Sequence, residues 1–201
     1  MQEALPADPP SLQIPQPADP KMFYVLEEYA APPVVAFSEN FDGVVTGWST
    51  GVDGGTATQW QLGTPINVGP LAAYSPLKCY GTNISTNYGY NANVWLRSPV
   101  LDLRAYTSGS LQFQEFFDIE KTYDYGSIRV LSAADGSVLA LLEPRIDGDS
   151  GGAWQSYSKA LPSSAFAQPI QIEFRLQSDD YDVVPHAGWY IDDFVISATA
   201  P

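Results

Sequence analysis

The stretch GWYIDDFVIS (residues 188–197) is a run of aromatic and β-branched residues near the C-terminus, a composition typical of a β-strand. Two adjacent carboxylates, Asp192 and Asp193, interrupt the run. Acidic side chains inside an apolar strand are costly unless something neutralises them. Ca²⁺ is a suitable neutraliser because it prefers carboxylate and carbonyl oxygens. The stretch therefore indicates a final strand that contributes to a cation site.

A second acidic stretch, SENFDG (residues 38–43), lies far upstream and is followed by Gly47 and Trp48. We expect the first and last strands to lie side by side and to share the ion. Asp42 would supply a carboxylate together with Asp192 or Asp193, and Glu39 or Asn40 would complete a shell that needs about 6–8 oxygens. The alternative is that these acids face solvent at strand ends.

From residue 34 onward, apolar runs alternate with turn signals. The segment 170–177 (IQIEFRLQ) alternates apolar and polar residues without error, which predicts a half-buried strand. About ten such short strands and no amphipathic helix indicate an all-β sandwich or barrel. With the first and last strands paired, we predict a two-sheet antiparallel jelly-roll sandwich. Residues 42–55 are expected to be turn-rich, and residues 63–93 to form long surface loops.

The N-terminal part has a different composition. Residues 1–33 carry eight of the 17 prolines, which favours an extended spacer. We predict two units: a proline-rich extension or linker at 1–33, and the sandwich at 34–199. Residues 22–26 (MFYVL) are the one apolar patch in the extension.

The formal net charge of −14 disfavours nucleic acid as a partner, because such a surface repels phosphate backbones. The single cysteine, Cys79, permits no intrachain disulfide. No apolar run approaches the roughly 18 residues of a membrane helix, so we expect no membrane insertion.

Three motifs together resemble a known family: SENFDG-x-x-x-GW (38–48), DIEKTYDYGSIRV (118–130) and GWYIDDFVIS (188–197). The chain resembles the MAM-like β-sandwich domains that accompany immune-inhibitor-A-type secreted metallopeptidases and bacterial cell-surface proteins. The first and last motifs also look like the ends of calcium-containing jelly-roll carbohydrate-binding modules. The resemblance implies bound calcium, with Asp42 and the Asp192–Asp193 pair as ligands, and a secreted or cell-surface location.

A second acidic group sits in two loops. Asp118, Glu120 and Asp124 lie in one loop region and Asp179 lies in another. If these loops face each other, they could hold a second cation. The alternative is a set of solvated loop acids that account for the net charge.

Two motifs imitate catalytic sites. GDSGG (148–152) matches the surroundings of the nucleophilic serine in chymotrypsin-like proteases, but the single histidine, His186, follows Ser150 and no AAHC motif is present. Asp118-x-Glu120 resembles part of a laminarinase-type pattern, but Phe116 stands where the nucleophile is needed. We therefore expect no catalytic residues, and a hairpin loop at GDSGG.

Aromatic residues are the remaining candidates for ligand binding. Exposed planar rings stack on sugars, whereas sandwiches bury tryptophans between their sheets. We expect Trp48 and Trp189 in the core. The candidate ligand-binding rings lie in the loop-rich region: Tyr74, Tyr80, Tyr88 and Tyr90.

The leading interpretation is a non-catalytic, extracellular, calcium-stabilised β-sandwich module that serves adhesion, interaction or accessory roles in a secreted or cell-surface protein. Its expected partners are other domains or surface proteins, with glycans as a further class. One alternative is a carbohydrate-binding module. Another is a self-assembling structural subunit in which residues 22–26 or the first strand add to a neighbour's sheet edge.

Overall fold

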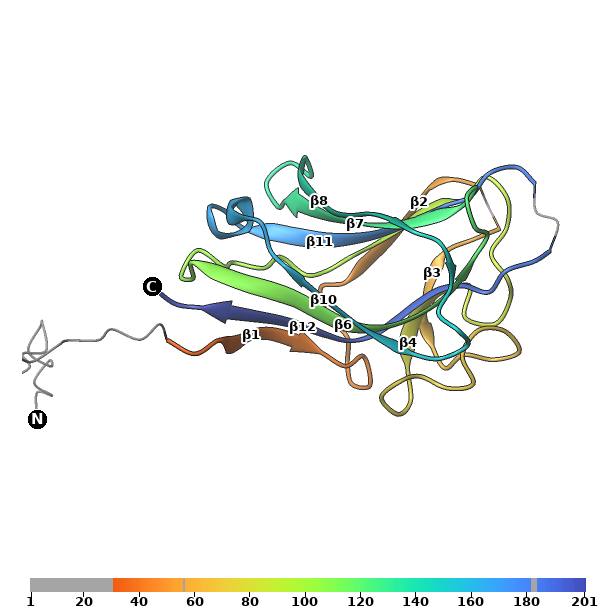
Figure 1. Ribbon diagram of the computed structural model, residues 1–201, viewed down its shortest axis with the longest axis horizontal. Coiled ribbons are helices and arrows are strands. Elements are labelled where there is room, and N and C mark those ends of the chain that lie inside the picture. The colour runs from red at the N-terminus through yellow and green to blue at the C-terminus, as the bar shows by residue number, and fades with distance from the viewer. Residues whose placement is uncertain (1–30, 56, 182–183) are drawn as a thin grey trace, which may run out of the picture.

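The computed structural model describes residues 31–55, 57–181 and 184–201. These residues form two antiparallel sheets packed face to face (Figure 1), so the predicted all-β jelly-roll sandwich is confirmed. Sheet A has the strand order β10-β6-β12-β4-β3, with β1 also paired to β12 and β9 to β6. Sheet B has the order β2-β5-β11-β7-β8. Only one helical turn, η1 (Ser163–Phe166), occurs in the described residues.

The strands of sheet A are β1 (Val34–Glu39), β3 (Trp60–Gly63), β4 (Cys79–Thr82), β6 (Ser108–Ile119), β9 (Gly148–Asp149), β10 (Gln155–Ala160) and β12 (Gly188–Thr199). The strands of sheet B are β2 (Ser49–Gly54), β5 (Asn93–Arg97), β7 (Tyr125–Ser132), β8 (Val138–Ile146) and β11 (Ile170–Gln177).

The first and last strands pair directly, as the sequence predicted. β1 runs antiparallel to β12, with Phe37 opposite Ile196 and Glu39 opposite Phe194. Figure 1 shows the two strands side by side along the lower edge of the sandwich. The pairing brings the SENFDG stretch next to the IDD stretch.

A β-bulge explains how β12 accommodates two consecutive acids. The register with β6 shifts between Asp192 and Val195, and Asp193 has a φ of 48°. An extra residue in a strand lets side chains on both sides of it point to the same face. Ile191 and Phe194 are therefore both fully buried between the sheets, although they are three positions apart.

The core lies between the sheets and is rich in aromatic rings. Phe174 of sheet B meets Phe113 and Trp189 of sheet A, with ring centroids 5.1 and 5.6 Å apart in edge-on contacts. Such contacts contribute beyond their apolar area. Trp189 is fully buried and Trp48 packs against the same cluster, so the prediction that both tryptophans belong to the core was correct.

The loop between β3 and β4 covers the outer face of sheet A. A second apolar cluster forms there, built on Cys79, Phe116, Ala187 and Tyr190. The expectation of loops throughout 63–93 was wrong for β4, which pairs with both β3 and β12. The expectation of a turn-rich 42–55 was likewise wrong for β2, which pairs with β5.

The outer face of sheet B carries an ion network. β11 alternates as predicted, but its outward Glu173 is 1% exposed instead of solvated. Three arginines surround this carboxylate, with N–O distances of 2.8 Å to Arg97, 2.9 Å to Arg175 and 3.5 Å to Arg129. Opposite charges this close offset the desolvation of a buried carboxylate.

The proposed boundary at residue 33 stays a prediction, because residues 1–30 lie outside the described part of the chain. The apolar patch at 22–26 also lies there. Within the described residues, no helix has the length and apolar character that a membrane crossing requires.

Candidate functional site

The strand junction expected to hold calcium contains one fully buried acid, Asp192. Its carboxylate accepts hydrogen bonds from the Ser75 backbone N–H at 3.0 Å, the Ser75 hydroxyl at 3.2 Å and the Asp193 N–H at 2.8 Å. Burial raises the pKa of Asp192 to about 6, against the lowering effect of these N–H groups. These hydrogen bonds thus provide part of the stabilisation of the buried Asp192 carboxylate. The sequence had suggested a cation for that role.

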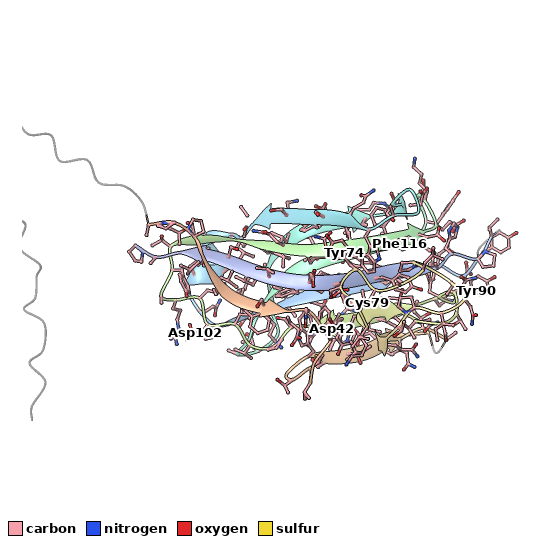
Figure 2. All side chains as sticks on the ribbon, turned by 90° about the horizontal axis from the view of Figure 1, so that it is seen from below. Asp42, Tyr74, Cys79, Tyr90, Asp102 and Phe116 are labelled. Carbon is pink, nitrogen blue, oxygen red and sulfur yellow. The ribbon has the colours of Figure 1, made fainter. Side chains whose placement is uncertain are left out.

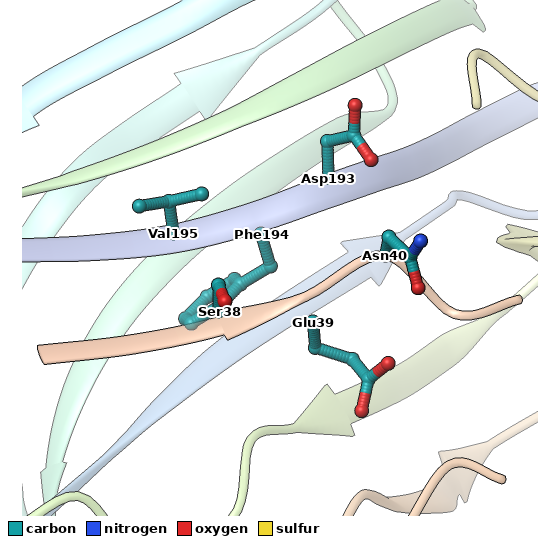
Figure 3. A pocket seen from close by; sticks show the side chains of 6 residues that line it. All are labelled: Ser38, Glu39, Asn40, Asp193, Phe194 and Val195. Carbon is teal, nitrogen blue, oxygen red and sulfur yellow. The ribbon is translucent and has the colours of Figure 1, made fainter. Parts of the chain in front are cut away.

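The other predicted ligands at this junction point in different directions. Asp42 accepts the Lys78 N–H at 3.1 Å, and Glu39 accepts the Phe41 N–H at 3.0 Å. Glu39, Asn40 and Asp193 line a cavity of about 360 Å³, but the side chains of Glu39 and Asp193 extend away from each other (Figure 3). A shared ion at Asp42, Asp192 and Asp193 therefore stays a prediction.

The second acidic group does converge. One ligand atom from each of Glu120, Asp124 and Asp179 lies within 4.8 Å of the others. This is the one such group of three His, Cys, Asp or Glu ligands among residues 31–55, 57–181 and 184–201. Asp124 is fully buried, whereas Glu120 and Asp179 are partly exposed.

Two loops at one end of the sandwich position this acidic triad. The β6–β7 loop carries Glu120 and Asp124, and the chain reaches Asp179 just after β11 ends. The Asp179 N–H donates to Oδ1 of Asp124 at 2.8 Å, which ties the two loops together. Oδ2 of Asp124 accepts the hydroxyl of Tyr88 at 2.5 Å.

One oxygen of the triad has no hydrogen-bond partner. Oε2 of Glu120 is buried, and no donor among the described residues reaches it. A buried polar atom without a partner costs about 1–3 kcal/mol, and more when it is charged. Such an atom beside two further carboxylates fits the donor set of a hard divalent cation.

Asp118, also expected in this group, belongs elsewhere. Its Oδ1 lies 2.7 Å from Nδ1 of His186, and its Oδ2 accepts the Ala187 N–H at 3.0 Å. Asp118 therefore contacts the loop before β12 and is not part of the convergent group of Glu120, Asp124 and Asp179.

The GDSGG loop has the geometry of a turn. Ser150 is buried, and its Oγ accepts the Phe117 backbone N–H at 3.3 Å. Gly151 and Gly152 both have positive φ, and the loop joins β9 to β10. Both β9 and β10 pair antiparallel with β6, with Asp149 opposite Asp118 and Gln155 opposite Glu115, so the chain continues along β6 through this turn and the expected hairpin was wrong.

The four candidate tyrosines divide into two pairs. Tyr80 and Tyr88 are only 8% and 4% exposed, so the expectation that they face a ligand was wrong. Tyr74 and Tyr90 are about half exposed, but they lie well apart along the molecule (Figure 2). The four residues therefore do not form one platform.

Two other tyrosines flank the acidic triad and were missed. Tyr123 and Tyr181 are 64% and 67% exposed, and with Glu120 and Asp179 they line a cavity of about 220 Å³. Their positions next to Asp124 and Asp180 were the available signal in the sequence.

The fold and the loop acids define a class: a two-sheet jelly-roll β-sandwich with a candidate cation site at one end. No family model matches the chain. A 164-residue stretch, 80% of the chain, is 34% identical to part of Bacillopeptidase F from Bacillus subtilis (strain 168). The chain spans about a tenth of the length of that curated relative, because the match covers 10% of it.

Two solved structures have the same fold. The K1 cleaved adhesin domain of Lys-gingipain from Porphyromonas gingivalis W83 aligns with a TM-score of 0.52 and 21% identity, over 81% of this chain and 97% of that domain. The K2 cleaved adhesin domain aligns with a TM-score of 0.54 and 15% identity, over 80% and 96%. At these identities the likeness concerns the fold alone.

Proposed function

We propose that this chain is a non-catalytic, MAM-like β-sandwich module of a secreted or cell-surface protein, and that a calcium ion bound by Glu120, Asp124 and Asp179 stabilises it. The observation that carries the proposal is the convergence of these three carboxylates, with Oε2 of Glu120 buried and unpartnered. The ion would bind the loops after β6 and β11 to each other.

Electrostatics and size both favour a cation there. Three carboxylates this close repel one another unless a positive charge lies between them. Oxygens that share one Ca²⁺ at about 2.3–2.6 Å lie up to about 5 Å apart, which agrees with the 4.8 Å spread of the triad. Loop carbonyls and water would complete the shell.

The relatives support a role as an accessory or adhesion module. One similar stretch belongs to Bacillopeptidase F, of which this chain matches only about a tenth. The two aligned domains of Lys-gingipain are named cleaved adhesin domains. The partial match to Bacillopeptidase F and the likeness to the adhesin domains both support an adhesion or interaction role within a larger protein.

Thermal unfolding with calcium and with EDTA tests the proposal. Binding to the folded state alone stabilises it by about 2.7 kcal/mol at 100 times Kd. For a chain of this size we expect the Tm to rise by about 5–10 °C. Glu120→Gln and Asp179→Asn should abolish the rise, and the matched control Asp193→Asn should keep it. A wild-type Tm that is the same in calcium and EDTA would contradict the proposal.

One observation favours carbohydrate binding as a second candidate function. Tyr123 and Tyr181 are largely exposed and line the same cavity as Glu120 and Asp179. Ring faces beside a cation suit a sugar, because the ring stacks while hydroxyl groups complete the coordination shell. Affinity gels containing soluble mannan or xylan test this: Tyr123→Ala should lose the retardation while keeping the calcium response. The strand-addition alternative stays a prediction, which sedimentation of the chain would test.

A further inference from the structure

An aromatic groove lies on the outer face of sheet A, away from the acidic triad. It encloses about 370 Å³ between the loop 70–74 and the turn 152–154. Phe116 of β6 contributes to its floor, and Figure 2 shows this residue close to Tyr74. Leu71 is fully exposed and Tyr74 is half exposed at the rim. The groove therefore presents apolar surface that the described chain leaves uncovered.

The groove is held in a fixed shape. The indole N–H of Trp154 donates to the carbonyl of Ala72 at 3.1 Å, which joins the two walls. The Trp154 ring meets Tyr74 at 6.1 Å and Phe116 at 6.3 Å between centroids. The positive φ of Gly151 and Gly152 turns the chain just before this tryptophan, which gives the GDSGGAW stretch a role in presenting the ring.

The lining offers apolar and aromatic contact surface to a ligand. It consists of Pro70, Leu71, Ala72, Ala73, Tyr74, Phe116, Gly152, Ala153 and Trp154. No carboxylate, ammonium or guanidinium group is among these residues, and the phenol of Tyr74 is the main polar side-chain group. A saccharide needs several convergent hydrogen-bonding groups, which this lining lacks. Aromatic, apolar grooves are typical receptors for PxxP segments, which have little conformational entropy to lose.

The chain itself contains such a segment twice. The tetrapeptide Pro-Ala-Asp-Pro occurs at residues 6–9 and again at residues 17–20. Each copy has the PxxP spacing. The second copy is the nearer of the two to the start of β1.

The connection between this copy and the groove is long enough. The groove lies beside the far end of β1, because the Ser75 hydroxyl is 3.3 Å from the carbonyl of Asn40, the residue after that strand. A six-residue strand such as β1 is roughly 20 Å long. Residues 21–33 span about 40 Å at the polyproline II rise of about 3.1 Å per residue. Residues 17–20 can therefore return along β1 to the groove.

We propose that this groove binds the Pro17–Pro20 segment of the same chain. The contact is an intramolecular one in which the proline rings pack against Trp154 and Tyr74. It covers the exposed Leu71 and holds the proline-rich extension against the sandwich. A proline-rich partner protein would compete with it for the same groove.

Trypsin cleavage after Lys21, next to this segment, provides the test on the full chain. Intact-mass measurement follows the loss of residues 1–21 over time. Leu71→Asp, Trp154→Ala and Pro17→Ala should each accelerate this cleavage at least fivefold. Tyr90→Ala and Pro6→Ala are matched controls, an exposed tyrosine and a proline of the other copy, and should leave the rate unchanged. Far-UV circular dichroism checks that each variant is folded.

Two results would overturn the proposal. Equal cleavage rates in the wild type, Leu71→Asp and Pro17→Ala would show that the groove and the segment do not meet. A wild-type rate that falls as protein concentration rises would show that the segment occupies the groove of a second copy.

Discussion

The hydroxyl oxygen of Tyr88 lies 2.5 Å from Oδ2 of Asp124 and also receives the Glu120 N–H at 3.0 Å. One buried phenol thus contacts two of the three residues in the acidic triad. Because Tyr88 packs in the hydrophobic core, it connects the candidate cation site to the rigid part of the sandwich.

Tyr88→Phe is expected to weaken calcium binding without removing a ligand. Groups that orient metal ligands contribute about 10- to 100-fold in affinity. We expect the calcium Kd to rise by about that factor while the stoichiometry of one ion is kept. Calorimetric titration measures both values. Tyr90→Phe, at an exposed position, should leave the Kd unchanged, and an unaltered Kd in Tyr88→Phe would contradict the positioning role.

Glu115 should make stability depend on pH. Its pKa is raised to about 7, chiefly by burial and to a smaller extent by the charge of Glu143, against the lowering effect of a hydrogen bond from the Trp189 indole. Since the folded-state pKa exceeds the unfolded one, the folded state binds the extra proton. The contribution of Glu115 to stability is therefore fully present below about pH 4.5, and about 3 kcal/mol of it is lost as pH rises to about 7.

Glu115→Gln isolates this contribution from other carboxylates. The amide is neutral at every pH and can still accept the Trp189 N–H. In urea unfolding from pH 5 to 8, we expect the variant to gain stability relative to the wild type as pH rises. A constant difference between the two proteins across this range would rule out Glu115 as the source.

Glu173 is expected to be the costliest carboxylate to remove. Its oxygens hold the Arg97, Arg129 and Arg175 guanidinium groups, and Arg175 is itself buried. Glu173→Gln removes the counter-ion that the three arginines share and leaves Arg175 only the half-exposed Asp53, and breaking a buried pair in this way costs about 3–5 kcal/mol. Asp102→Asn, which breaks an exposed ion pair with Arg104, should cost less than about 1 kcal/mol. Similar denaturation midpoints for the two variants would contradict this ranking.

Gly188 begins β12 in a conformation that few residues tolerate. Its φ is 96°, and a Cβ there would lie 2.1 Å from the Thr82 hydroxyl oxygen. Gly136, at φ 73°, has no atom within 4 Å of the same position. Gly136→Ala should therefore cost about 1–2 kcal/mol for the backbone alone, and Gly188→Ala about 1–3 kcal/mol more for the clash. Equal losses of Tm in the two variants would show that the segment around Thr82 moves aside and relieves the clash.

The fold could be predicted where side-chain pattern alone decides the structure. The alternation of residues 170–177 and the apolar run of 188–197 specified the central strands, and the acids on SENFDG and IDD anticipated the pairing of β1 with β12. β2 and β4 were missed because they are short and contain glycine and polar residues. Their strand conformation comes from pairing with β5 and with β3 and β12.

The candidate site could be predicted only in part, because it also depends on contacts between segments that are far apart in the sequence. Acidic loops at Glu120, Asp124 and Asp179 could be recognised as a group, but the sequence does not reveal which carboxylates meet. Asp118 sits on β6 and is engaged by His186, which arrives from a loop far along the chain. Tyr88 packs in the core and its hydroxyl bonds to Asp124, a contact between residues 36 positions apart that the sequence does not reveal.

Calcium titration followed by isothermal calorimetry tests the central claim most directly. We expect one saturable calcium site in the wild type, retained in Asp193→Asn at the strand junction and lost in Glu120→Gln at the acidic triad. Binding that survives in Glu120→Gln and disappears in Asp193→Asn would place the ion at the junction of β1 and β12 and contradict the account.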